Sequence, residues 1–164
     1  MDLYCAVSGL EQAMWDICGK VCGVPIYMLL GGACRDKIRV YANGWSSGSE
    51  DPAELAERAA AIVDKGFTAL KFDPIPGPWR TFIDRDTEKR TVENVRAVRQ
   101  AVGSKVDVLI EMHRRLAPMH SVRIARDIEQ YEPYWYEEPV LAENIDALAT
   151  VRRDINLPVV TGEE

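Results

Sequence analysis

The chain has 164 residues, of which 47% are hydrophobic and 28% are charged, and its formal net charge is −6. This composition is typical of an ordinary globular domain rather than a disordered or fibrous protein, and the negative charge without a basic face argues against a nucleic-acid partner. No apolar run approaches the ~20 residues of a membrane span and the N-terminus lacks a signal-peptide pattern, so we expect a cytoplasmic protein without a membrane contact.

The first part of the chain is predicted to be helical. Apolar residues recur at three- and four-residue steps from Ala6 to Lys20, which indicates an amphipathic helix, and a second short turn leads to Gly31-Gly32. All four cysteines fall in this part, and we expect small buried thiols in a reducing compartment rather than a zinc site, which would need more ligands. We interpret residues 1–36 as a helical lead-in and residues 37–164 as the start of an α/β domain.

Five short apolar segments, bounded by turn residues, predict β-strands at residues 38–42, 69–72, 106–112, 134–137 and 158–161. Helices are predicted between them at residues 51–65, 87–102, 121–131 and 143–153. Strands that alternate with helices imply parallel pairing and right-handed crossovers.

Two architectures fit this alternation: an open doubly wound sheet and part of a (β/α) barrel. No glycine-rich phosphate loop follows the first strand, which weakens the dinucleotide-binding version of the open sheet. A complete barrel has eight strands, and this chain supplies five. We therefore expect a partial (β/α) TIM-type barrel of about five parallel strands.

Acidic residues stand where the last three predicted strands end. Glu111, Glu137 and Glu163 are separated by 137 − 111 = 26 and 163 − 137 = 26 residues, so each occupies an equivalent place in successive strand–helix units. In a barrel these strand ends form one face, and three ionised carboxylates there require a cation. An all-oxygen ligand set suits magnesium better than zinc. The alternative is three loop acids that face water.

Other polar residues share strand faces with these acids. Side chains two apart on a strand point the same way, so Glu111 is expected beside His113, and Lys71 beside Asp73. Lys71 would place a positive charge near an anionic substrate. The alternative interpretation of Lys71 is a buried lysine that pairs with Asp73. The second histidine, His120, is interpreted as a surface residue.

Several segments carry a family resemblance over essentially the whole chain: AVSGLEQAMWDICGKVCGVPIYMLLGG, ALKFDP, LIEMHRR, WYEEPV and VVTGEE. They resemble the enolase superfamily, mandelate racemase branch, and within it the acid-sugar dehydratases of the galactonate dehydratase type. The resemblance implies the C-terminal barrel domain of that superfamily, without its capping domain and its later strands.

The resemblance also implies roles for residues of this chain. Glu111, Glu137 and Glu163 would be the ligands of Mg²⁺, Lys71 would begin the K-x-K motif, and His113 would be the general acid. The pattern departs from the family at three positions. Asp73 replaces the second lysine of the motif, Glu111 stands where many relatives carry Asp, and Arg114 stands where glycine often follows the histidine.

The implied reaction is dehydration of a sugar acid. A base removes the α-proton next to the carboxylate, an enediolate forms, and His113 protonates the departing β-hydroxyl to give a 2-keto-3-deoxy acid. We expect a small-molecule sugar-acid substrate and a homo-oligomeric enzyme. The residues that we expect to bind the substrate are Asp73, Arg115, Asn43 and Trp45.

Two alternatives stay open. A racemase, epimerase or cycloisomerase of the same superfamily would use the same metal, although Asp73 counts against an enzyme with two bases. The chain is otherwise an inactive truncated fragment, because no residue in it stands out as the α-proton base. We expect no turnover from the isolated chain.

Overall fold

A computed structural model describes residues 2–78 and 80–163. The chain divides into two compact units, one up to Arg39 and one from Val40 to Glu163. In the first unit, helix α1 (Asp2–Cys22) is followed by the short helix α2 (Ile26–Leu29), as predicted. The prediction of buried cysteines is wrong, because all four are exposed free thiols. Most apolar side chains of α1 are exposed too, so its amphipathic pattern does not bury a face within this unit.

The second unit alternates helices and strands. Its elements in chain order are α3 (Pro52–Asp64), β1 (Ala69–Phe72), α4 (Arg85–Val102), β2 (Asp107–Glu111), α5 (Pro118–Ile128), the 3-10 turn η1 (Glu129–Tyr131), β3 (Trp135–Glu137), α6 (Ile145–Asp154) and β4 (Val159–Val160). Among the described residues, none of the helices has the length and apolarity that crossing a membrane demands.

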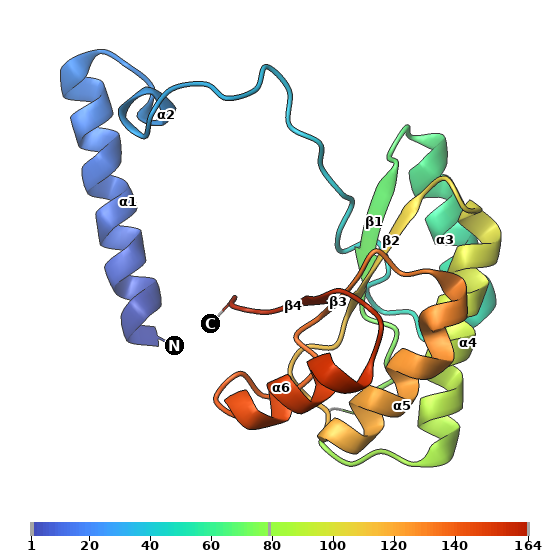
Figure 1. The fold of residues 1–164 in the computed structure, drawn as a ribbon. Coiled ribbons are helices and arrows are strands. Elements are labelled where there is room, and N and C mark those ends of the chain that lie inside the picture. The colour runs from blue at the N-terminus through green and yellow to red at the C-terminus, as the bar shows by residue number, and fades with distance from the viewer. Residues whose placement is uncertain (1, 79, 164) are drawn as a thin grey trace. The chain divides into compact units, whose positions relative to one another are not determined.

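The sheet is parallel, with its strands in the order β1-β2-β3-β4. Neighbours along the chain are therefore neighbours in the sheet, as predicted for consecutive barrel units. Helices α3, α4, α5 and α6 lie on one face of this sheet (Figure 1). The sheet does not close within the described residues, so the predicted partial barrel is confirmed.

The first predicted strand, at residues 38–42, is wrong. Of these residues only Ala42 forms a bridge, to Leu70 of β1, through its own N–H to Ala69 and its carbonyl to the N–H of Lys71. Ile38 and Val40 are largely exposed. Their β-branched side chains are not packed, and β propensity without packing does not secure a strand.

Local signals in the sequence determine the helix starts. The side chains of Asp51 and Asp84 accept hydrogen bonds from the first backbone N–H groups of α3 and α4, and Asn144 does the same for α6. Helix α5 begins three residues earlier than predicted, because Pro118 occupies its first turn, where no N–H is needed. Gly103 ends α4 with a φ of 73°, which glycine adopts without strain.

The two faces of the sheet differ in chemistry. Leu70, Val108, Ile110 and Tyr136 are buried in the hydrophobic core that the helices cover. Each such burial contributes about 1.5–3 kcal/mol, which fixes the strands against the helices. Successive side chains of a strand point to opposite faces of the sheet. The residues directly after three of these core residues, Lys71, Glu111 and Glu137, therefore point to the face opposite the helices.

Candidate metal centre

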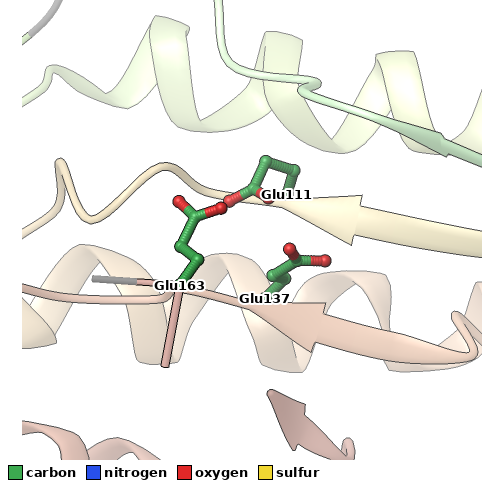
Figure 2. A group of neighbouring side chains, drawn as sticks. All are labelled: Glu111, Glu137 and Glu163. Atoms are coloured by element: carbon green, nitrogen blue, oxygen red, sulfur yellow. The ribbon is translucent and has the colours of Figure 1, made fainter. Parts of the chain in front are cut away.

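The sheet register brings two of the predicted carboxylates together. Glu111 ends β2 and pairs directly with Glu137, the last residue of β3. Glu163 follows β4 by three residues and points back toward them (Figure 2). One carboxylate oxygen of each of these residues lies within 4.8 Å of the corresponding oxygens of the other two. The predicted convergence at the carboxyl ends of the strands is confirmed.

These three carboxylates could each give one oxygen ligand to a divalent cation. Oxygens on opposite sides of an ion at ~2.1 Å lie about 4.2 Å apart, so three oxygens that lie within 4.8 Å of one another are close to the spacing of a ligand set. The donors are all carboxylate oxygens, which favour a hard cation. Glu111 and Glu137 are buried, whereas Glu163 is exposed and reaches the cluster from a loop.

Lys71 on β1 supplies positive charge at the cluster. Its Nζ lies 2.6 Å from Oε1 of Glu137 and 3.0 Å from Oε2 of Glu111, and its side chain is only 9% exposed. Burial by itself lowers the pKa of Lys71, but the hydrogen bonds to Glu137 and Glu111 outweigh it and raise that pKa. The raised pKa favours the protonated form of Lys71. The alternative in which Lys71 pairs with Asp73 is wrong, because its ion pairs are with Glu111 and Glu137.

The remaining carboxylate oxygens of the buried pair are also held. Oε1 of Glu111 accepts the backbone N–H of His113 at 2.8 Å, and Oε2 of Glu137 accepts the indole N–H of Trp135 at 2.8 Å. Burial raises the pKa of Glu111, and the nearby carboxylate of Glu137 acts in the same direction. Both effects reflect the cost of placing two negative charges in a buried site.

His113 and Asp73 form a second group at the same face. Nδ1 of His113 lies 3.0 Å from Oδ2 of Asp73, which also forms an ion pair with Arg115. Because an ionised carboxylate only accepts hydrogen bonds, Asp73 holds the proton of His113 on Nδ1. The histidine side chain is 43% exposed, so a ligand can reach it.

Most of these groups line one cavity of about 740 Å³. Residues 46–50, from a serine-rich loop, form part of its wall. The predicted site residues among its lining are Asn43, Lys71, Asp73, Glu111, His113 and Glu163. Lys71 and His113 therefore face the same cavity as Glu111 and Glu163, as predicted, whereas Glu137 does not line it.

Two expected substrate-binding residues do not line this cavity. Trp45 packs on Phe72 with ring centroids 5.3 Å apart, and Arg115 is buried against Asp73. His120, interpreted as a surface residue, is also buried, and its Nδ1 lies 2.6 Å from Glu88. Each of these side chains is turned inward by a tertiary partner that local sequence does not reveal.

Residues that the sequence analysis missed complete the surroundings. The ring of Tyr41 lies 5.7 Å from Nζ of Lys71, and Trp135 contacts the edge of that ring. Glu138, the acid next to Glu137, is 1% exposed and accepts hydrogen bonds from residues 161–163. The pair of consecutive glutamates at the end of β3 was the feature of the sequence that could have indicated a role for Glu138.

Comparison with known proteins assigns the family. Residues 54–164 match the family described as Enolase C-terminal domain-like, and this is more than half of the chain. The chain belongs to this family, as its resemblance to the enolase superfamily implied.

Curated relatives of the chain are sugar-acid dehydratases. A D-gluconate dehydratase of Thermoproteus tenax is 43% identical over 158 residues, which are 96% of this chain and 32% of the relative. A D-gluconate/D-galactonate dehydratase of Picrophilus torridus is 37% identical over 166 residues, which are 99% of this chain and 41% of the relative. The chain thus spans well under half the length of these relatives.

Solved structures agree with this family assignment. A mandelate racemase/muconate lactonizing enzyme from a Jannaschia species aligns with a TM-score of 0.88 and 37% identity, covering 96% of this chain and 43% of that one. A member of the enolase superfamily from Salmonella Typhimurium aligns with a TM-score of 0.87 and 32% identity, covering 94% and 44%.

Proposed function

We propose that this chain supplies the Mg²⁺ centre and the proton donor of a sugar-acid dehydratase. The observation that carries the proposal is the convergence of three glutamates, two of which line the same cavity as Lys71 and His113. We propose an aldonic acid such as D-gluconate or D-galactonate as the substrate, because the relatives are named for these acids. The polar loop at residues 46–50, which lines the cavity, offers partners for the hydroxyl groups of such a substrate.

Each residue of the site would have a separate role in the reaction. Glu111, Glu137 and Glu163 would hold the ion, which when bound would neutralise charge on the substrate carboxylate as the α-proton leaves. Lys71 would add a positive charge next to that carboxylate.

His113 would act on the leaving group. Asp73 holds Nδ1, so Nε2 of the protonated ring would give its proton to the β-hydroxyl. Loss of the α-proton, cleavage of the Cβ–O bond and release of water leave an enol that tautomerises to a 2-keto-3-deoxy acid. We assign the α-proton base to no residue of this chain.

A racemase or epimerase has less support. Such an enzyme needs bases on both faces of the α-carbon, and the second position of the lysine motif is Asp73. Its carboxylate is already engaged by His113 and Arg115 and by the N–H of Ile75.

The test is to graft this chain in place of the matching segment of the Thermoproteus tenax D-gluconate dehydratase. We expect Mg²⁺-dependent formation of 2-keto-3-deoxy acid from D-gluconate or D-galactonate, lost in the graft with Glu137→Gln. The reaction is run in D₂O. Deuterium at the α-carbon of recovered substrate without dehydration would contradict the proposal and favour the racemase or epimerase.

A further inference from the structure

Glu163 differs from the other two carboxylates in what holds it. Glu111 and Glu137 are strand residues whose relative positions follow from the register of β2 and β3. Glu163 lies three residues beyond β4, a strand of two residues, and its side chain is 42% exposed. Strand pairing therefore does not determine where its carboxylate lies.

Glu138 makes the contacts that strand pairing does not make. Its Oε1 accepts the N–H of Gly162 at 2.6 Å and the N–H of Glu163 at 3.3 Å. Its Oε2 accepts the hydroxyl of Thr161 at 3.1 Å. A buried carboxylate that accepts hydrogen bonds from three consecutive residues fixes the backbone of that segment.

The backbone of Glu138 ties the same segment to the loop after β2. Its N–H donates to Val160 at 2.9 Å, and its carbonyl accepts the N–H of Arg114 at 2.8 Å. Arg114 in turn forms an ion pair with Glu163. Glu138 has a φ of 44°, a conformation that non-glycine residues rarely adopt, and this turn directs its side chain toward residues 161–163.

We infer that Glu138 is a positioning residue that holds Glu163 in reach of the ion, an inference that rests on the proposed metal centre. Glu138 is not among the clustered carboxylates, so it acts through Glu163 and not as a ligand. A partner outside the ligand set typically changes metal affinity about 10- to 100-fold. Glu138→Ala should therefore weaken metal binding by that factor.

The experiment measures the binding of Mn²⁺ to the whole 164-residue chain through the relaxation of water protons. Glu138→Ala should lose affinity as Glu163→Gln does, with the same rise in relaxivity as water replaces the lost carboxylate. The double variant should be no weaker than Glu163→Gln alone, because both changes remove one ligand. Glu138→Gln keeps one acceptor for the N–H of Gly162, so its Mn²⁺ affinity should stay within about threefold of that of the wild-type chain. If Glu138 were itself a ligand of the ion, the same substitution would lower the affinity by more than that. Glu57→Ala, an exposed site on α3, controls for the charge change.

Amide hydrogen exchange without metal gives an independent readout. In Glu138→Ala the N–H groups of Gly162 and Glu163 should exchange at least about tenfold faster, because their acceptor is gone. Wild-type Mn²⁺ affinity in Glu138→Ala, or losses that add in the double variant, would overturn the inference. If the wild-type chain binds no Mn²⁺, the proposed function fails, and unchanged exchange at these two amides would then overturn the positioning role separately.

Discussion

The ammonium group of Lys71 lies 2.6 Å from Oε1 of Glu137. The same nitrogen lies 3.0 Å from Glu111, so one lysine contacts both buried carboxylates of the cluster. It therefore stabilises the pair electrostatically, and it would also repel a cation bound to the same oxygens.

Replacing Lys71 should thus have two opposite effects. Lys71→Met leaves two buried carboxylates without their cation, which should lower the free energy of unfolding in EDTA by about 3–5 kcal/mol. The affinity for Mg²⁺ should rise, because a like charge has been removed. Urea unfolding with EDTA and with Mg²⁺ measures both effects. Lys65→Met, an exposed site, is the control, and equal stability of the two variants would contradict the prediction.

His113→Asn should remove the proton donor without disturbing the metal centre. The histidine has a φ of 50°, a conformation that asparagine tolerates better than most residues, so the loop should keep its shape. In the grafted enzyme, turnover should fall about 10²- to 10⁴-fold while Mn²⁺ affinity changes little. His120→Asn is the control, since it should cost stability but not turnover per folded molecule. Full activity of His113→Asn would refute its role as the acid.

The lowered pKa of Glu88 should make the free energy of unfolding depend on pH. Burial alone raises the pKa of Glu88, but hydrogen bonds to Arg85 and His120 and the charge of Arg123 outweigh it and lower that pKa below 4.5. The unfolded chain then takes up the proton first on acidification, so this stabilisation is complete above about pH 4.5 and lost as pH falls through the folded pKa. Urea unfolding from about pH 6 to about pH 3 should show a weaker dependence in Glu88→Gln. Glu57→Gln should retain the full dependence, and equal slopes in all three proteins would contradict this.

Much of the fold follows from local sequence signals. The alternation of strands with helices predicts the parallel sheet and the order of its strands. The equal spacing of three glutamates predicts their convergence, because residues at equivalent places in repeated units lie on the same face.

The parts that could not be predicted depend on tertiary partners. The apolar residues at 38–42 predict a strand, but only Ala42 pairs with β1. His120 is buried because Glu88, 32 positions away, accepts its hydrogen bond. Lys71 pairs with carboxylates on two other strands, which the register of the sheet places beside it, and not with Asp73, which directly follows its own strand.

The isolated chain should show no dehydratase turnover. Lys71 pairs with two buried carboxylates, the three clustered glutamates are proposed to bind the ion, and His113 is proposed to donate a proton, so we assign the α-proton base to none of these five residues. The assay incubates the pure chain with Mg²⁺ and a panel of hexonates and hexarates and measures 2-keto-3-deoxy acids. Turnover that disappears in Glu137→Gln would contradict this prediction.

The central claim is that Glu111, Glu137 and Glu163 hold one divalent ion, and calorimetric titration of the chain with Mg²⁺ tests it most directly. We predict one site per chain in the wild-type protein, and loss of that site in Glu111→Gln and in Glu137→Gln. Glu57→Gln, which changes charge equally at an exposed position, should bind as wild type does. No saturable binding, or a site that survives both buried substitutions, would contradict the claim.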